Sequence, residues 1–504
     1  MPLFPKAATH PTEVALSDGT RQVCWAELED RVARFANSLR DDHGLGLDSH
    51  IALLMHNRIE AIEGMLAGIA AGAWVTPVNW HLTPQEIAYV LGDSGAQLVL
   101  SDEAHESIAR SHVGGTVVRV GDELDGMLAN ASDAPIDAES PSGGNMIYTS
   151  GTTGYPKGVQ RARPATLADS IAGQRAYADS IALDGSGAHL VTGPLYHAAP
   201  LMMAIYDMHN GAPVLVMPRW DEREFLRSVD EQNVRHTHLV PTMLVRLLRL
   251  PEEERAASLR PNLSVVLHGA APISPRVKHE VIEWWGPILL EYWGGSEGGV
   301  NTLIDSEDWL AHPGSVGRCL PPFEVFATDA DGTRLPTDEV GTLYCRDSRF
   351  DEPFRYHGDE EKTASAYLEP GVFTLGDMGW IDSEGYVHLA DRKSNMIISG
   401  GVNIYPAEIE QVLIGHPAVA DVGVFGIPDD EWGEAVKAAI ELAEGFEASD
   451  ELATTILEYA REHLAKYKLP RTVDFEDELP RSSAGKLYVR RLRDKYWEGR
   501  SKRI

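Results

Sequence analysis

The chain has 504 residues, 43% of them hydrophobic and 24% charged, which is a globular composition and long enough for at least two domains. Its formal net charge of −32 argues against a nucleic-acid or anionic-membrane partner, because both depend on clustered Lys and Arg. Three scattered cysteines and an N-terminal stretch without the signal-peptide pattern predict a reduced, soluble, cytoplasmic protein. The most apolar stretch, 64–75, is too short to be a transmembrane segment.

Short apolar runs alternate with amphipathic segments along the first half of the chain. Strands are predicted at 50–56, 73–79 and 96–102, and helices at 59–72 and 84–93. The pattern returns after residue 185, with further strands predicted at 189–195, 212–218, 236–242, 263–269 and 287–293. Strands that are apolar on both sides and separated by helices indicate parallel sheets covered on both faces.

The pattern changes near residue 312. Residues 312–347 are predicted to form short strands joined by Gly, Pro and Asp turns, which indicates a small β-subdomain. An α+β stretch follows, with helices predicted at 406–414 and 449–465 and strands at 419–427 and 435–442. We therefore predict an α/β fold. A large N-terminal domain (1–391) contains two doubly covered, mostly parallel sheets plus the β-subdomain, and a small α+β C-terminal domain (392–504) follows.

The stretch YTSGTTGYPKG (148–158) combines glycines, hydroxyl residues and one lysine in the manner of a phosphate-binding loop. It does not have Walker spacing, because Pro156 precedes Lys157 and Gly158 follows it. From the residues alone, this stretch is either a nucleotide-binding loop of another geometry or an ordinary turn.

A serine hydrolase site and a structural metal site have weaker support in the sequence. GGSEG (294–298) matches the nucleophile elbow G-x-S-x-G, but no helix is predicted after it and the carboxylate beside the serine opposes an oxyanion. The histidines lack H-E-x-x-H or other ligand spacing, so a structural metal is not expected. In RHTH (235–238), one buried and one exposed histidine are predicted.

Five polar, Gly-rich stretches remain, each predicted to lie at the carboxyl end of a strand, where ligands gather in α/β sheets. They are YTSGTTGYPKG (148–158), PLYHAAP (194–200), HGAAP (268–272), YWGGSEGG (292–299) and LGDMGW (375–380). Any one of them could be a turn, but five in one chain indicate a binding site.

With these motifs in order along essentially its whole length, the chain resembles the adenylate-forming superfamily, and within it the fatty-acid-type acyl-CoA ligases. The resemblance implies that a carboxylic acid and ATP give an acyl-adenylate and pyrophosphate, after which CoA gives acyl-CoA and AMP. It implies ATP, Mg²⁺ and coenzyme A, with a small-molecule carboxylic acid as partner. Two alternatives to a CoA ligase stay open: an enzyme that transfers the acyl group to a carrier-protein thiol, and a relative without catalytic activity. A homodimer is an expected oligomeric state.

The resemblance also implies roles for residues of the N-terminal domain. Glu297 is the expected Mg²⁺ ligand, since it offers a hard carboxylate oxygen. Trp293 stands where the family usually has Tyr but can still stack on a purine, and Ser296 stands where it has Thr. The expected ATP and AMP contacts are Thr149, Ser150, Gly151, Thr152, Thr153, Gly154, Lys157, Gly269, Ala270, Ala271, Tyr292, Trp293, Gly294, Ser296, Asp377 and Arg392.

The C-terminal domain resembles the family's mobile lid. Lys486 falls at the position of the catalytic lysine, where a fixed cation offsets the charge that builds up when a carboxylate attacks the α-phosphate. The hinge falls at Ser394, where relatives usually carry Asp or Lys. The expected CoA contacts are Ser399, Gly400, Gly401, Lys466 and Lys468.

The identity of the acid substrate is the property that the sequence determines least. His197 matches the residue beside the carboxylate and the acyl tunnel, and it joins Lys486 and Glu297 as an expected catalytic residue. No Asp stands where amino-acid-activating relatives hold the α-ammonium, so a free amino acid is not expected. The expected pocket is apolar, which favours a medium or long fatty acid, then a bulky sterol- or bile-type acid, then an aryl acid. Its residues are His197, Leu201, Met202, Met203, Gly294 and Gly295.

Overall fold

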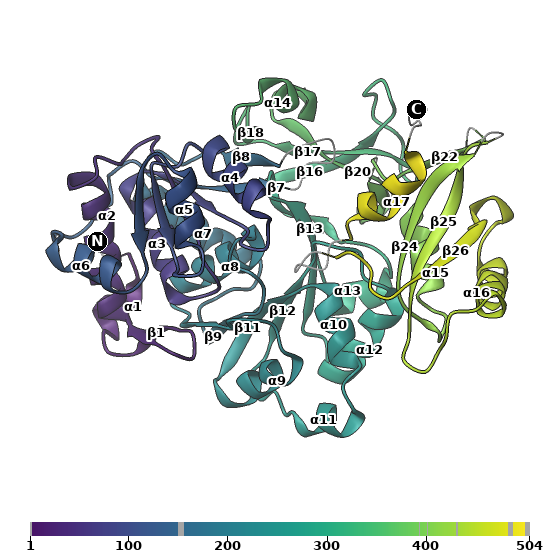
Figure 1. Ribbon diagram of the computed structural model, residues 1–504, viewed down its shortest axis with the longest axis horizontal. Helices are drawn as coiled ribbons and strands as arrows, with labels where there is room; N and C mark the ends of the chain where they lie inside the picture. Colours follow the sequence, from purple (N-terminus) through teal and green to yellow (C-terminus); the bar gives the residue numbers. More distant parts are fainter. Residues whose placement is uncertain are drawn as a thin grey trace.

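The computed structural model describes residues 3–149, 156–392, 394–400, 402–429, 432–481 and 487–498. Their strands form four sheets: two in a large N-terminal part, one in a small all-β unit, and one in a C-terminal part (Figure 1). The predicted α/β class, with two large sheets, a β-subdomain and a small α+β unit, is confirmed.

The first large sheet has nine strands in the order β15-β14-β13-β12-β11-β9-β10-β1-β2. The six strands from β13 to β1 run parallel, and antiparallel strands close both edges. The strands are β1 (Val14–Ser17), β2 (Gln22–Cys24), β9 (Ala188–Val191), β10 (Val214–Val216), β11 (Val234–Leu239), β12 (Val265–His268), β13 (Leu289–Gly295), β14 (Gly299–Asp305) and β15 (Arg318–Cys319).

The second large sheet has seven strands in the order β18-β8-β7-β4-β3-β5-β6. Strands β7, β4, β3, β5 and β6 are parallel, and β8 and β18 add an antiparallel edge. The strands are β3 (His50–Leu54), β4 (Trp74–Pro77), β5 (Leu98–Ser101), β6 (Thr116–Arg119), β7 (Gly144–Thr149), β8 (Lys157–Arg161) and β18 (Phe354–Tyr356).

Helices connect and cover these two sheets, as parallel strands require. They are α1 (Pro5–Thr9), α2 (Trp25–Asp41), α3 (Ile59–Ala71), α4 (Pro84–Asp93), α5 (Glu106–His112), α6 (Asp122–Asn130), α7 (Leu167–Ser180), α8 (Ala198–His209), α9 (Glu222–Glu231), α10 (Pro241–Leu248), α11 (Glu252–Ala257), α12 (Pro275–Trp285), α13 (Ser306–Ala311) and α14 (Glu360–Ala366).

One hydrophobic core lies between the two large sheets, shared by α2, α3 and α8. All 13 residues of α3 are buried, which explains its nearly continuous apolar sequence. Glycines let this helix lie close to the strands: a Cβ on Gly68 would stand 2.4 Å from Val75 Cγ2, and one on Gly64 would stand 2.8 Å from Leu53 Cδ2. No helix among the described residues is long and apolar enough to cross a membrane.

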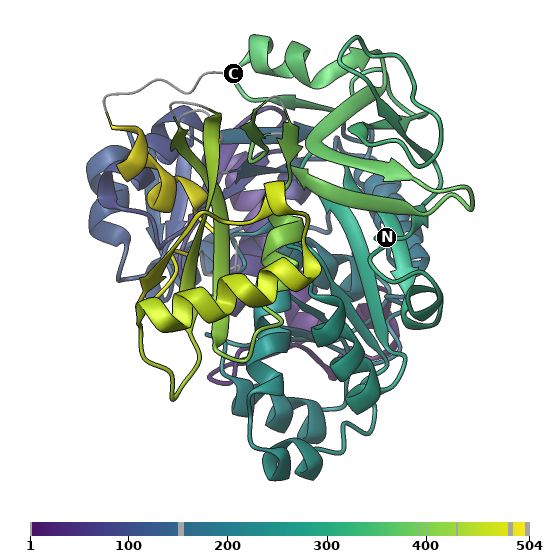
Figure 2. The ribbon, with the colours of Figure 1, turned by 90° about the vertical axis from the view of Figure 1, so that its right-hand side faces the viewer.

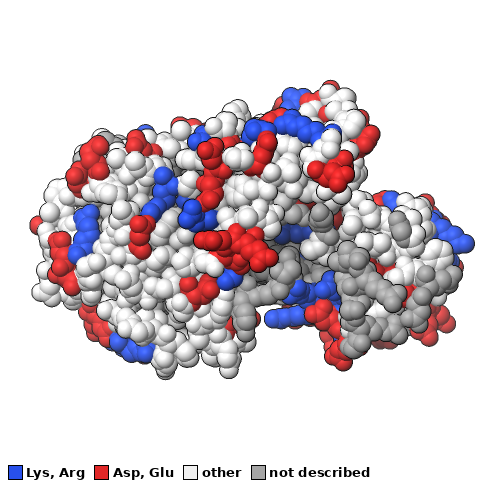
Figure 3. All heavy atoms as spheres, turned by 90° about the horizontal axis from the view of Figure 1, so that it is seen from above, with Lys and Arg blue, Asp and Glu red and all other residues white. Residues whose placement is uncertain are grey.

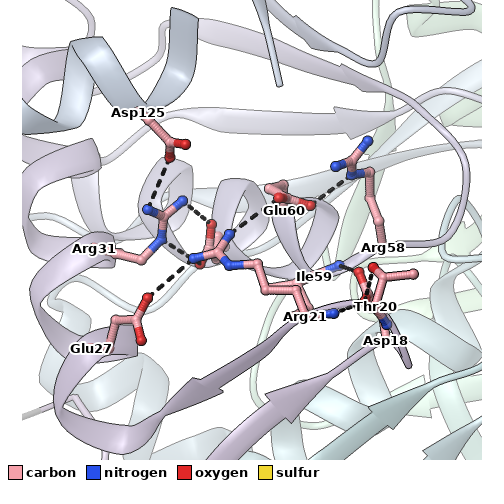
Figure 4. Close-up of polar contacts among 10 residues, drawn as sticks. Asp18, Thr20, Arg21, Glu27, Arg31, Arg58, Ile59, Glu60 and Asp125 are labelled. Atoms are coloured by element: carbon pink, nitrogen blue, oxygen red, sulfur yellow. Dashed lines mark hydrogen bonds and ion pairs between the residues drawn. The ribbon is translucent and has the colours of Figure 1, made fainter. Parts of the chain in front are cut away.

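Ion pairs join α2 to α3 at the edge of this core (Figure 4). The Arg31 guanidinium contacts both carboxylate oxygens of Glu63, at 2.7 and 3.0 Å, and it also contacts Asp125 of α6 at 3.2 Å. Arg21, which precedes β2, contacts Glu60 of α3 at 3.2 Å. Glu63 is buried, and a buried carboxylate that loses its partner destabilises a fold strongly, so the Arg31–Glu63 pair fixes how α2 and α3 pack.

The β-subdomain is an antiparallel sheet in the order β16-β17-β20-β19, with β21 beside β20. Its strands are β16 (Phe323–Thr328), β17 (Gly341–Asp347), β19 (Tyr367–Glu369), β20 (Val372–Ile381) and β21 (Val387–Arg392). The motif LGDMGW was predicted to follow a strand, and this is wrong, because residues 375–380 lie inside β20. Residues 374–376 in the middle of β20 are only half-buried, which allows polar residues inside the strand.

Helices cover both faces of the C-terminal sheet, which has the order β23-β22-β25-β24 with β26 beside β25. Ile409 of α15 and Ile456 of α16 pack on one face and Leu492 of α17 on the other; Figure 2 shows α16 lying across the sheet. The elements are β22 (Ile397–Ser399), β23 (Val402–Ile404), α15 (Pro406–Leu413), β24 (Val419–Asp429), β25 (Gly433–Leu442), α16 (Asp450–His463), the short 3₁₀ helix η1 (Lys466–Lys468), β26 (Thr472–Glu476) and α17 (Val489–Trp497). The domain boundary at 391/392 stays a prediction.

Candidate active site

The YWGGSEGG stretch forms an antiparallel hairpin, in which Gly295 of β13 pairs with Gly299 of β14. A second strand, and not a helix, follows Ser296, so the nucleophile-elbow geometry is not formed. Gly294, one of the expected pocket residues, also lies very close to the second strand: a Cβ on it would lie 1.8 Å from the Gly299 carbonyl oxygen. Gly294 is therefore needed for the close approach of the two strands.

Three predicted nucleotide contacts are linked across the boundary between the nine-stranded sheet and the β-subdomain. Trp293 Nε1 donates to Asp377 Oδ2 at 2.8 Å, and Arg392 Nε lies 3.2 Å from Asp377 Oδ1. Asp377 and Arg392 are paired residues of β20 and β21. Trp293 and Asp377 are buried, whereas Arg392 is exposed. The link joins residues 84 positions apart in the chain.

Tyr292 and Trp293, both predicted to contact ATP or AMP, point to opposite sides of β13, as successive strand residues do. Trp293 packs in the core of the β-subdomain, with Leu343 and Phe373. Tyr292 faces the other way, and its hydroxyl lies 3.0 Å from His238 Nε2. Their contacts with the nucleotide stay predictions.

The predicted Mg²⁺ ligand Glu297 stands in the turn of the hairpin, half-buried. The Tyr356 hydroxyl donates to Glu297 Oε1 at 3.0 Å, and Lys362 Nζ lies 3.9 Å from the centre of the Tyr356 ring. Burial lowers the pKa of Lys362, and the nearby Glu297 carboxylate opposes this change. Tyr356 and Lys362 were not among the predicted site residues, because nothing in their local sequence distinguishes them from other turn and helix residues.

The described ends of the predicted phosphate loop are Thr149 on β7 and Lys157 on β8, which pair across the two strands. Lys157 Nζ lies 3.5 Å from Asp93 Oδ1, and the Tyr148 hydroxyl donates to Asp93 Oδ2 at 2.7 Å. Burial alone would lower the pKa of Lys157, but Asp93 outweighs this effect and raises it, so the side chain stays cationic. Ser150, Gly151, Thr152, Thr153 and Gly154 lie outside the described residues.

The HGAAP stretch begins at His268, the last residue of β12. Gly269 lies against Tyr292, and a Cβ there would stand 2.8 Å from the tyrosine ring. Ala270 has a positive φ of 66°, which is unusual for a residue with a side chain, and it lines the cavity described next. Ala271 is half-buried beside it. Their place along the adenine stays a prediction.

A cavity of about 210 Å³ lies between the hairpin, β8, α7 and α8. His197, which precedes α8, lines it together with Met202, Met203, Gly294 and Gly295. Leu201 does not: it is fully buried in the core between the large sheets. The reason is helical periodicity, because the cavity face of α8 carries residues at spacings of three and four. Beyond the first turn of α8, in which Ala198, Ala199 and Pro200 all line the cavity, this face carries Met202, Met203 and Tyr206.

Both histidines of the RHTH stretch are buried, so the prediction of one buried and one exposed histidine is wrong. His236 and His238 are two residues apart on β11 and therefore share a face of the sheet. His236 Nδ1 lies 2.7 Å from Asp207 Oδ2, while His238 lines the cavity. Burial lowers the pKa of His238 to about 3, so the cavity wall carries a neutral imidazole here.

A further His/Asp cluster forms where spacing along the chain predicted none. His56 Nδ1 and His105 Nδ1 each lie 2.6 Å from one oxygen of Asp102, and their ligand atoms all lie within 4.8 Å of one another. Burial alone would raise the pKa of Asp102, but the hydrogen bonds from the two histidines outweigh it and the pKa is lowered. In this structure the carboxylate is satisfied by hydrogen bonds.

The predicted hinge and CoA contacts lie in the C-terminal part. Ser394 follows the end of β21 and is exposed, and Ser399 ends β22. Gly400 has a φ of 59° and donates to the Trp432 carbonyl oxygen, and a Cβ on it would lie 2.3 Å from the Trp432 ring. Lys468 of η1 contacts both oxygens of Glu408 at 2.6 Å, and Lys466 of η1 is exposed. Gly401 and Lys486 lie outside the described residues.

Comparison with known proteins gives the family. The profile of the family described as AMP-binding enzyme matches residues 3–349, and that of the AMP-binding enzyme C-terminal domain matches residues 408–486. The chain belongs to the AMP-binding enzyme family. Members of this adenylate-forming family similar to the chain include acid–CoA ligases, and the predicted recognition and the class of acid–thiol ligase are confirmed.

Relatives whose names give different acid substrates are equally similar to this chain. The chain is 32% identical to the long-chain-fatty-acid–CoA ligase FadD13 of Mycobacterium tuberculosis (strain ATCC 25618 / H37Rv), over 90% of this chain and 89% of the relative. It is also 32% identical to a feruloyl-CoA synthase of Amycolatopsis sp, over 97% of both chains. The solved structure of the o-succinylbenzoate CoA synthetase MenE from Bacillus subtilis with its acyl-adenylate intermediate matches with a TM-score of 0.81 and 28% identity, covering 100% of this chain and 99% of that one. The family is therefore established, and the acid is not.

Proposed function

We propose that the protein is an acyl-CoA ligase that activates a compact, largely hydrophobic carboxylic acid. A carboxylate oxygen bonds to the α-phosphorus of ATP while the bond to pyrophosphate breaks. The CoA sulfur then bonds to the acyl carbon, AMP leaves, and the thiol proton passes to solvent. The observation that carries the proposal is that one hairpin, β13–β14, borders both the cavity and the linked set of Trp293, Asp377 and Arg392.

The proposed roles follow from where the side chains stand. The acid occupies the cavity with its carboxylate toward His197 and Ser296, and ATP lies along the hairpin turn, Lys157 and Asp377. Glu297 fits a hard divalent cation, because it offers carboxylate oxygens beside the Tyr356 hydroxyl. Such a cation, when bound, offsets phosphate charge. Lys486 is proposed to supply a further cation to the reacting carboxylate and α-phosphate.

Charge supports an anionic substrate in this part of the molecule. The chain carries a net charge of −32, so a polyanion needs a locally basic approach. Figure 3 shows Lys and Arg side chains in the hollow between the large part and the C-terminal part. ATP and CoA are both polyanions, and this hollow is the proposed entry for them.

The size of the cavity limits the size of the acid that it can hold. A volume of about 210 Å³ is below the roughly 300–1,000 Å³ of pockets that hold drug-sized ligands. Its methionines adapt to irregular shapes. We therefore rank a medium-chain or aryl acid above the long-chain and sterol-type acids that the sequence also suggested.

The test is pyrophosphate release from Mg²⁺-ATP across a panel of carboxylic acids, each with and without CoA. Release that depends on the acid and rises with CoA supports the proposal. Release that depends on the acid but not on CoA would favour a carrier-protein thiol as acceptor. No release with any acid would contradict the proposed function. A homodimer stays a prediction, which the molecular mass in solution checks.

A further inference from the structure

One cationic side chain enters the wall of the acyl cavity. Arg161 is the last residue of β8, and it lines the cavity beside Asn145 of the neighbouring strand β7. Its guanidinium lies against the β13–β14 hairpin: Nη2 donates to the Gly298 carbonyl oxygen at 3.3 Å, and Nη1 stands 3.0 Å from where a Cβ on Gly299 would be. Arg161 thus reaches the cavity from the large sheet that does not carry the hairpin.

Within the described part of the chain, this guanidinium has no Asp or Glu oxygen within 4.0 Å, and the bond to Gly298 is its one hydrogen bond. Arg163, two residues further on, is the opposite case: it contacts Asp48 at 2.7 Å and lies over the Trp74 ring. A guanidinium carries five N–H donors, and a cation withdrawn from water without a counter-ion is costly. N–H donors of the Arg161 guanidinium therefore remain available to hydrogen-bond a bound ligand.

A second donor converges on the same place. The Tyr177 hydroxyl lies 3.3 Å from the Cβ position of Gly299, beside the guanidinium. It accepts a hydrogen bond from the Val300 N–H at 2.8 Å, which leaves its own hydrogen to donate. Burial raises the pKa of Tyr177 to about 12 and Arg161 opposes that change, which agrees with their proximity. A guanidinium and a neutral hydroxyl side by side form a receptor for an oxygen anion.

We propose that Arg161 makes the enzyme selective for an acid that carries a second carboxylate at the end of a compact apolar body. This inference rests on the proposed acid–CoA ligase function. The Arg161 fork fits a carboxylate with two parallel hydrogen bonds, which a phenol or a hydrocarbon end cannot accept. The reacting carboxylate lies toward His197, and the second one binds between Arg161 and Tyr177. The apolar walls, including Met203 and Val300, hold the body of the acid.

Matched acids test the inference. We would measure kcat/KM for pyrophosphate release with octanoic and octanedioic acids, and with hydrocinnamic acid and its para-hydroxy and para-carboxy derivatives. We expect the unaltered enzyme to prefer the diacid of each set. Arg161→Leu should lower kcat/KM for the diacids about 100-fold, since two charge-assisted hydrogen bonds are lost. It should leave the monoacids unchanged or improved. The selectivity ratio is the decisive quantity.

Two variants serve as controls. Arg163→Leu removes a cation from the same segment but outside the cavity, so the ratio of diacid to monoacid should not change. Arg161→Lys keeps the charge and loses the fork, so an intermediate ratio is expected. An equal loss for every acid in Arg161→Leu, or an unaltered enzyme that prefers the monoacid or the phenol, would overturn the inference. Unfolding temperatures check that each variant is folded.

Binding separates this inference from the proposed function. Calorimetric titration of the full-length protein with octanedioate requires no turnover. Heat of binding that Arg161→Leu abolishes and Arg163→Leu retains supports the site, even if no acid releases pyrophosphate and the ligase proposal fails. Equal binding by the unaltered protein and Arg161→Leu would overturn the site, even if the ligase reaction proceeds.

Discussion

Glu297 lies in a tight turn, and we expect its negative charge to contribute to function more than its packing does. The side chain is half-buried, and its recorded hydrogen bond is from the Tyr356 hydroxyl. An amide oxygen can accept the same bond. Exchanging the carboxylate for an amide should therefore remove one negative charge at nearly constant geometry.

Glu297→Gln is expected to lower acyl-adenylate formation about 100-fold and to raise the Mg²⁺ concentration needed for half-maximal rate, because a divalent cation loses a charged ligand. The measurement is pyrophosphate release as a function of Mg²⁺. Glu324→Gln, an exposed glutamate of the β-subdomain paired with Arg334, is the matched control. An unchanged Mg²⁺ dependence in Glu297→Gln would remove the metal assignment.

Helix α15 shows how one half-buried side chain can make an element sensitive to pH. Glu410 is half-buried on this helix and accepts a hydrogen bond from the Val424 N–H of β24 at 2.8 Å. Burial raises its pKa from the ordinary 4.5 to about 8, against the effect of that hydrogen bond. The folded protein therefore binds the Glu410 proton more tightly than the unfolded chain does.

The contribution of Glu410 to the free energy of unfolding is fully present below pH 4.5. It falls as the pH rises to about 8, because the carboxyl group ionises at a lower pH in the unfolded chain than in the folded protein. Each pKa unit corresponds to about 1.4 kcal/mol, so Glu410→Gln should flatten the pH dependence and stabilise the protein above pH 8.

Urea unfolding followed between pH 4 and pH 9 checks this prediction, with the C-terminal part observed through its own tryptophans. Glu458→Gln on the exposed side of α16 should reproduce the unaltered pH profile. If the Glu410→Gln profile also matches the unaltered one, Glu410 does not carry the pH dependence.

Hydrogen bonds join the N-terminal and C-terminal parts of the molecule. The Arg249 side chain of the N-terminal part donates to the Ala420 carbonyl oxygen of β24 at 2.8 Å. Asp391, at the end of the β-subdomain, accepts from the Ala407 N–H of α15 at 2.8 Å. Figure 3 shows a hollow between the two parts. Such an arrangement suits the mobile lid that the sequence predicts for the C-terminal part, and we infer that this lid presents different faces in the two half-reactions.

Lys486→Ala should therefore separate the two half-reactions. We expect acyl-adenylate formation to fall by at least about 100-fold, because a fixed cation at the developing charge is lost. Thioester formation from a supplied acyl-adenylate and CoA should remain within a few-fold of the unaltered rate. Single-turnover measurements of each step check this.

Lys495→Ala is the control for Lys486→Ala, since this lysine pairs with Glu476 at 3.0 Å and is not assigned to the site. It should leave both steps unchanged. An equal loss of both half-reactions in Lys486→Ala would contradict a C-terminal part that uses two faces.

The order of elements and the family could be determined from the sequence alone, because both depend on local patterns. Apolar periodicity located β3, α3 and α15 to within a few residues of their observed bounds. The Gly-rich motifs keep their order along the chain whatever their environment. The β13–β14 hairpin shows the same principle, since two adjacent glycines in GGSEGG do not begin a helix.

Only the tertiary structure decided which side chains meet. Trp293 contacts Asp377, and Arg161 reaches the hairpin, because strands far apart in the sequence lie side by side, and sheet order cannot be read from spacing along the chain. Leu201 enters the core while Met202 lines the cavity, since a 100° step on α8 separates the two faces. His236 and His238 are both buried because they share one face of β11 and that face is covered. Local sequence specifies elements and turns, whereas the chemistry of the cavity wall depends on which elements pack together.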